Sequence, residues 1–110
     1  MSFFKKIFII GLMFQATLAY SNSEFKNVDI SQLTVHDYGT YIFVGLKQQA
    51  QNDEKCTNNY ALALQKSHPL FKEMYATLIF TFANGLPIAG WVNGCSEFGY
   101  PVLTRLDVIK

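Results

Sequence analysis

The longest regular pattern of apolar residues after the N-terminal region lies between Ser67 and Gly85. Apolar side chains recur there every three or four residues, which places them on one face of a helix. Ser67 as N-cap and Pro69 in the first turn suit the start of this helix, and Gly85 followed by Pro87 suits its end. The pattern therefore predicts a helix of about four turns. Five residues should pack it against a core: Phe71, Met74, Tyr75, Leu78 and Phe82.

Alternating apolar and polar residues predict strands on both sides of this helix. The five predicted strands are residues 27–36, 40–46, 60–64, 88–92 and 102–109. The first should be interrupted by a bulge or bend near Ser31, where the apolar phase changes. Residues 40–46 carry apolar side chains on both faces, which is typical of a central strand. Residues 20–26 and 47–59 are polar, so we expect a frayed segment and a loop.

The order of these elements is strand, strand, strand, helix, strand, strand. This order occurs in the OB-fold, a five-stranded barrel with a helix between its third and fourth strands. The sequence therefore predicts an α+β, mainly β fold with an OB-like barrel. An open five-stranded sheet with the helix on one face has the same order and stays an alternative. A barrel is favoured because the strands leave no plainly polar face for solvent.

Residues 1–19 have the features of a secretory signal peptide. Lys5 and Lys6 precede a short apolar run over residues 7–14, and small residues near Ala19 suit cleavage. A membrane anchor is the alternative, but this run is shorter than the roughly 18 apolar residues that a span needs. We therefore expect a single mature domain, residues 20–110, that is periplasmic or secreted and has no stable membrane insertion.

The two cysteines, Cys56 and Cys95, are predicted to form a disulfide bond. Paired thiols normally oxidise in exported chains, and a small domain gains much from a covalent cross-link. A metal site or a redox thiol pair is the alternative. The two residues lack the close spacing that such sites have.

The charge balance excludes one class of partner. The chain has a formal net charge of +1, which becomes about −1 without Lys5 and Lys6. Nucleic-acid binding usually requires a clustered basic surface, and the sequence has none. We therefore predict no nucleic-acid partner.

Several segments together resemble small exported bacterial proteins of unknown function. The segments are Cys56–Leu64, the helix ending in Asn84–Pro87, Trp91–Cys95 and Gly99–Leu103. In layout these proteins are similar to the OB-fold B subunits of AB-type toxins, above all that of subtilase cytotoxin. The resemblance covers about residues 40–109. It implies the fold, export and assembly into oligomers, and it carries over no sugar-binding residue.

The sequence shows no persuasive catalytic set. His36 and His68 are the only histidines, and they lie in different contexts, so we interpret them as surface residues rather than as an acid–base or metal pair. Asp53 and Glu54 could bind a cation but are more often simply solvated. We therefore predict a protein that is not an enzyme and has no metal or cofactor, with a small hydrolase as the least favoured reading.

Phe80 lies on the otherwise polar side of the predicted helix, beside Glu73 and Thr77. There it could form a self-association surface or dock a partner. The alternative is that another segment of the chain covers it.

A second aromatic group occupies the last loop, at Glu97, Phe98 and Tyr100. In an OB-fold this loop lies near the ligand rim, together with the turn at Asp37 and Tyr38. Aromatic faces beside carboxylates suit sugars, although Phe98 and Tyr100 could instead plug the barrel. The sequence thus favours an exported binding module with a glycan ligand. The alternative is an exported inhibitor or immunity protein that binds another protein.

Overall fold

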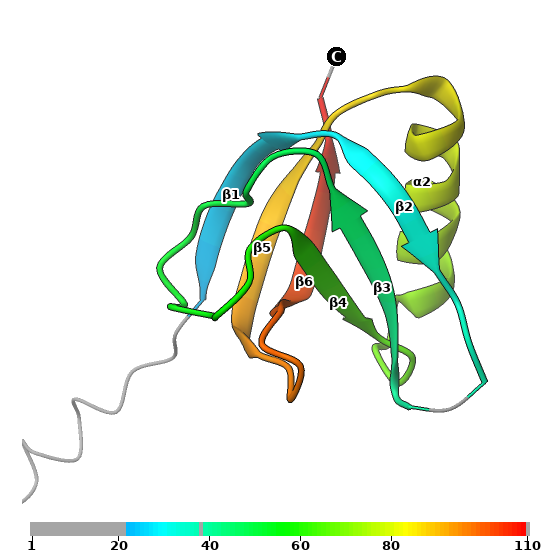
Figure 1. Ribbon diagram of the computed structural model, residues 1–110. Helices are drawn as coiled ribbons and strands as arrows, with labels where there is room; N and C mark the ends of the chain where they lie inside the picture. The colour runs from blue at the N-terminus through cyan, green and yellow to red at the C-terminus, as the bar shows by residue number, and fades with distance from the viewer. Residues whose placement is uncertain (1–21, 38, 110) are drawn as a thin grey trace, which may run out of the picture.

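The computed structural model describes residues 22–37 and 39–109. The predicted signal peptide, residues 1–19, lies outside them. Six strands and the predicted helix are found in this part of the chain (Figure 1). In order they are β1 Ser23–Val28, β2 Ile30–Thr34, β3 Tyr41–Leu46, β4 Ala61–Gln65, α2 Phe71–Asn84, β5 Ile88–Cys95 and β6 Pro101–Val108.

Strand β1 begins earlier than the sequence predicts. The polar composition of residues 20–26 predicts a frayed segment, and this is wrong from Ser23 onward. Phe25 is 1% exposed and Val28 is 2% exposed, so both contribute to the core. Burying two large apolar side chains is enough to hold an otherwise polar strand in place.

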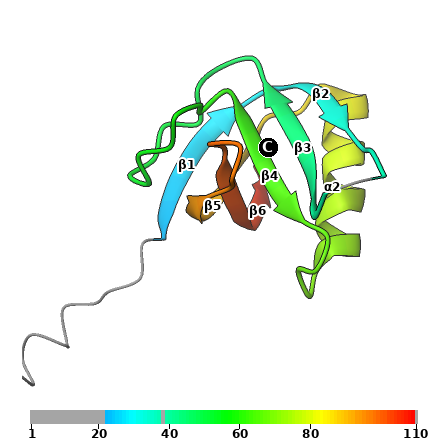
Figure 2. The same ribbon diagram turned by 60° about the horizontal axis from the view of Figure 1, so that its bottom comes forward.

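β1 and β2 form one curved stretch that is interrupted only at Asp29 (Figures 1 and 2). The backbone N–H of Asp29 donates to Oε1 of Gln48, in the loop after β3, rather than to a strand. The predicted bend near Ser31 corresponds to a register irregularity between Ile30 and Gln32. β1 pairs antiparallel with β5, and β2 pairs antiparallel with β3. The two parts of this stretch therefore lie at opposite ends of the sheet.

The strand order of the sheet is β1-β5-β6-β4-β3-β2. Neighbouring strands are antiparallel except β4 and β6, which are parallel and meet at Ala63 and Val102. The predicted α+β, mainly β class is confirmed. The sheet has six strands rather than five because residues 23–28, most of them predicted to be frayed, form β1 before the break at Asp29, and it is not closed into a barrel.

The core lies between the inner face of the sheet and α2. On β3, Ile42, Val44 and Leu46 are buried, while Tyr41 and Phe43 on the opposite face are half-buried. β3 pairs with both β2 and β4, which confirms its predicted central position. The outer face of β3 is therefore only partly covered, and it carries aromatic side chains.

The start of α2 differs from the prediction. The helix begins at Phe71 with Leu70 as its N-cap, and no side chain caps it, so the predicted role of Ser67 is wrong. Instead, Nδ1 of His68 accepts a hydrogen bond from the backbone N–H of Leu70 at 3.0 Å. This local turn satisfies a backbone donor before the helix begins.

The end of α2 is as predicted, whereas its buried face is rotated. Gly85 adopts the left-handed conformation, with φ 63°. Met74 and Leu78 are buried as predicted, but Phe82 is 44% exposed and Thr81 is buried in its place. The hydroxyl of Thr81 donates to the carbonyl of Leu78, which removes the cost of burying it.

Candidate ligand-binding site

An aromatic cluster forms around Phe43 on the outer face of β3. The ring of Phe43 meets those of Phe98 and Tyr100 edge-on, with centroids 5.3 Å and 5.5 Å away. The rings of His36 and Tyr41 lie 5.8 Å and 6.2 Å from it. Edge-to-face contacts at these distances are favourable, so the rings hold one another in place. The cluster joins the loop after β2 to the loop after β5.

A surface hollow of about 290 Å³ lies against this cluster. Residues of β2, β3, β4 and the β5–β6 loop line this aromatic hollow: Gln32, Thr34, Phe43, Gly45, Ala61, Phe98 and Tyr100. Gly45 and Ala61 face each other across β3 and β4, and their small size leaves the space open. An added Cβ at Gly45 would lie 3.3 Å from Cβ of Gln32, so larger residues would narrow the hollow.

Polar groups border the aromatic hollow on the β2 side. Nε2 of Gln32 donates to Oγ1 of Thr34 at 3.0 Å, and both residues line the hollow. This pair leaves the carbonyl of the Gln32 side chain and the second hydrogen of its amide for other partners. The hollow thus offers ring surfaces on one side and an amide and a hydroxyl on the other.

The β5–β6 loop is held by its own hydrogen bonds. Oγ of the buried Ser96 accepts from the backbone N–H groups of Phe98 and Tyr100, both at 3.3 Å. The N–H of Ser96 donates to the carbonyl of Tyr100 at 2.7 Å. Phe98 is nevertheless 50% exposed, and neither Phe98 nor Tyr100 belongs to the buried core cluster. Both rings pack on the outside of the sheet rather than plugging its interior.

The predicted disulfide bond joins the end of β5, where this loop begins, to the loop between β3 and β4. Cys56 and Cys95 are bonded, with their Cα atoms 5.6 Å apart. Four residues after Cys95, the backbone approaches the loop that carries Cys56 so closely that a Cβ added to Gly99 would clash with Oγ1 of Thr57. Gly99 also has φ +84°, a conformation that favours glycine. The prediction of a bond between Cys56 and Cys95 is confirmed.

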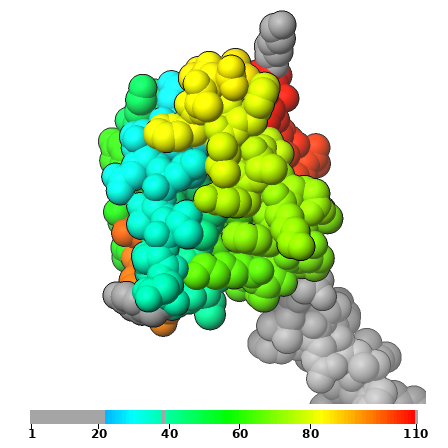
Figure 3. All heavy atoms as spheres, turned by 90° about the vertical axis from the view of Figure 1, so that its right-hand side faces the viewer, coloured from blue at the N-terminus to red at the C-terminus, as the bar shows by residue number. Residues whose placement is uncertain are grey.

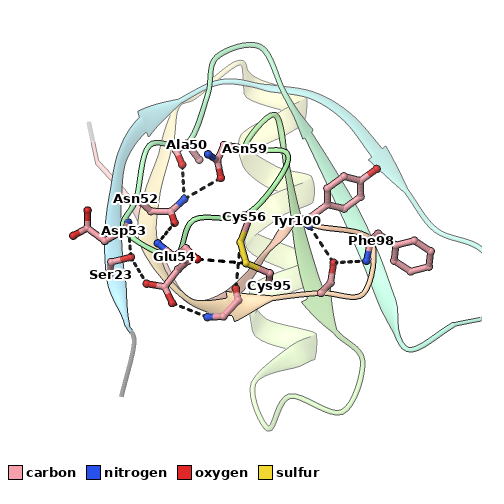
Figure 4. Close-up of a disulfide and its surroundings, with 12 residues drawn as sticks. Ser23, Ala50, Asn52, Asp53, Glu54, Cys56, Asn59, Cys95, Phe98 and Tyr100 are labelled. Atoms are coloured by element: carbon pink, nitrogen blue, oxygen red, sulfur yellow. Dashed lines mark hydrogen bonds between the residues drawn. A yellow bond between two sulfur atoms is a disulfide. The ribbon is translucent and has the colours of Figure 1, made fainter. Parts of the chain in front are cut away.

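Glu54 stabilises the opposite side of the disulfide. Its Oε1 accepts from the N–H of Gly94 at 2.7 Å, and its Oε2 accepts from the hydroxyl of Ser23 at 2.5 Å. Figure 4 shows Glu54 and Ser23 on one side of the disulfide and Phe98 and Tyr100 on the other. The carboxylate therefore links β1 to the end of β5. Glu54 therefore has a structural role. This role differs both from cation binding and from simple exposure to solvent, the two interpretations that the sequence allowed.

Only some of the residues predicted to form the ligand rim line the aromatic hollow. Phe98 and Tyr100 line the aromatic hollow. Asp37 and Glu97 are exposed at neighbouring loops, and no contact between these two carboxylates is found among the described residues. Tyr38 lies outside the described part of the chain. The two loops do converge, because His36 and Phe98 both contact Phe43.

The sequence did not indicate that Phe43 and Gln32 line the hollow, or that the small residues Gly45 and Ala61 do. One signal was present: Tyr41, Phe43 and Gly45 alternate with the buried residues of β3, so they had to share an outer face. Strand pairing decides which residues adjoin them, and spacing along the chain does not reveal it.

Two kinds of feature are absent from residues 22–37 and 39–109: a metal-binding cluster and a membrane-spanning helix. No three His, Cys, Asp or Glu side chains are grouped there in a way that could hold a metal ion. No helix within the same residues has the length and apolar character needed to cross a membrane. The ring of His36 contacts Phe43, whereas Nδ1 of His68 accepts from the backbone N–H of Leu70 before α2.

No protein-family model matches the chain, and no curated protein is similar to it in sequence. The geometry of the aromatic hollow is therefore the basis for assigning a function.

Proposed function

We propose that the chain is an exported, non-enzymatic binding module whose ligand is a glycan, bound in the aromatic hollow. The observation that carries the proposal is the combination of exposed ring surfaces with an amide and a hydroxyl, around Phe43, Phe98 and Gln32. Sugars combine apolar C–H faces with hydroxyl groups, and small-ligand sites typically pair apolar walls with a few polar groups. A net charge near zero agrees with a neutral ligand.

We further propose that the architecture is OB-like. Its support is the strand order, the parallel pairing of β4 with β6, the helix between β4 and β5, and one curved stretch that pairs at both ends of the sheet. In OB-folds the ligand face lies on the second and third strands, beside the loops between strands one and two and between strands four and five. The corresponding places here are β3, β4 and the loops that carry His36 and Phe98. The relation to toxin B subunits stays a prediction.

Export is supported by the disulfide bond, because such bonds persist in oxidising compartments. We propose export together with cleavage of a signal peptide. The residues predicted to form that signal peptide, 1–19, lie outside the described part of the chain.

The test is a glycan array with two matched variants. We expect the native protein to bind a defined set of glycans and Phe98→Ala to lose that binding, because the ring forms one wall of the hollow. Tyr60→Ala is the control: Tyr60 is 51% exposed, like Phe98, but it does not line the hollow. Thermal unfolding should show that both variants are folded. Binding that survives Phe98→Ala would place the site elsewhere, and no binding to any glycan would favour a protein partner.

A further inference from the structure

The C-terminal half of β6 presents an unpaired edge. β6 pairs with β5 along its whole length, but its pairing with β4 is limited to Val102. Within residues 22–37 and 39–109, no strand pairs with Thr104–Val108 on the side away from β5. Alternate backbone N–H and C=O groups point outward along such an edge and can bind another strand.

A groove of about 450 Å³ separates this edge from the first half of α2. The residues that line this α2–β6 groove are Leu70, Glu73, Met74 and Thr77 on the helix side and Thr104, Arg105 and Leu106 on β6. Figure 3 looks onto this side of the molecule, with β2 (cyan) on one side of the helix and β6 (red) on the other. An added strand would therefore lie beside a helix as well as against the edge.

Apolar side chains border the groove and are exposed. Leu70 at its helix side is 54% exposed. Phe80 follows Glu73 and Thr77 at spacings of seven and three residues, so it lies on the same side of α2, and it is 58% exposed. At the end of β6, Val108 and Ile109 are 40% and 56% exposed. A partner along this edge could cover all four.

The edge of β6 carries one positive and one negative side chain, Arg105 and Asp107, which two copies of the strand could pair with each other. Nε of Arg105 lies 3.0 Å from Oδ1 of Asp107, and both side chains are accessible. If a second β6 is laid antiparallel to the first and centred on Leu106, Arg105 of each copy faces Asp107 of the other. Opposite charges directly across an antiparallel pair are favourable.

We propose that the edge of β6 and the α2–β6 groove are the docking surface for a second copy of this chain, which pairs its own β6 antiparallel about a two-fold axis at Leu106. A two-fold contact is self-complementary, because every residue contact occurs twice. A foreign extended peptide would find the same backbone groups. Only the second copy is certain to present the opposite charge to both Arg105 and Asp107.

The test exchanges these two charges. Arg105→Asp places Asp opposite Asp across the axis, and Asp107→Arg places Arg opposite Arg, so we expect each variant to raise the dimer Kd roughly tenfold or more. A mixture of the two variants should form a heterodimer, because each Asp then faces an Arg. The double variant R105D/D107R should dimerise like the native protein. Multi-angle light scattering and native mass spectrometry on the purified full protein measure these masses.

Strand β1 provides the control. Glu24 and Lys26 are exposed and two residues apart on β1, which β5 separates from β6, and neither residue lines the α2–β6 groove. Glu24→Lys and Lys26→Glu should leave the mass unchanged. The proposal is overturned if the native protein stays monomeric at its highest soluble concentration, if the single variants remain dimers, or if mixing them restores nothing. An assembly larger than a dimer would overturn the two-fold arrangement.

Discussion

The aromatic hollow and the α2–β6 groove both expose apolar side chains, but they are built in different ways. The hollow depends on an irregular loop, which the Cys56–Cys95 disulfide and the buried Ser96 hold in place. The groove lies between two regular elements whose own hydrogen bonds fix them, and its edge has backbone groups without a strand partner among the described residues. The first arrangement fixes rings around a small space, which suits a small ligand. The second offers a long row of donors and acceptors, which suits another polypeptide strand.

Removing the disulfide should have the largest effect, and it should affect the aromatic hollow but not the α2–β6 groove. The double variant C56S/C95S should lose about 4 kcal/mol of unfolding free energy, since the bond closes a loop of 39 residues. Where the variant is still folded, glycan binding should weaken while the dimer Kd stays unchanged. Denaturant unfolding, array binding and light scattering measure the three quantities. A dimer that dissociates along with the loss of glycan binding would contradict the separation.

Gly99 offers a smaller and more local change on the hollow side. Gly99→Ala should cost about 2 kcal/mol, because it combines a left-handed conformation with a clash against Thr57. Gly94→Ala is the matched control: its φ of +71° is similar, but no atom lies within 4 Å of the added Cβ. We expect about 1 kcal/mol there. Equal losses in the two variants, measured by chemical denaturation, would show that the contact with Thr57 does not hold the loop.

Phe80→Asp should have the smallest effect on stability. It should weaken dimerisation through the α2–β6 groove and leave glycan binding at the aromatic hollow unchanged. Phe80 is 58% exposed, so the free energy of unfolding should change by about 0.5 kcal/mol or less. The dimer should nevertheless weaken, as light scattering would show. Leu78→Ala, on the buried side of the same helix, should instead cost about 2–5 kcal/mol. A Phe80→Asp variant as unstable as Leu78→Ala would mean that Phe80 is covered within its own chain.

Features set by local chemistry were predictable from the sequence. Gly85 ends α2 because the left-handed position after a helix favours glycine, and the alternation within β3 gives the correct inward face. The pairing of Cys56 with Cys95 follows from there being two cysteines in a chain expected to be exported.

Features that depend on tertiary contacts were not predictable. β1 is held by Phe25 in a polar run, and the gain from burying it comes from residues far along the chain. Ser67 has the right chemistry for an N-cap, but the turn formed by His68 delays the helix. In the candidate site, Phe98 and Tyr100 were recognisable as an unusual aromatic pair. Phe43 became part of the site only because β3 lies beneath their loop.

The curved β1–β2 stretch has a consequence for how the chain folds. Ser23 pairs with Val92, so the first strand finds its partner almost at the other end of the domain. Contacts this distant in sequence slow folding, because a long loop must close before they form. During synthesis, β5 and β6 emerge after the other described elements, and until then β1 has no strand partner. The sheet therefore cannot be completed on a growing chain until β6 has been released, because β1 pairs with β5 and β5 with β6. For the export proposed above, this delay would keep the chain in an incompletely folded state that can be threaded through a membrane.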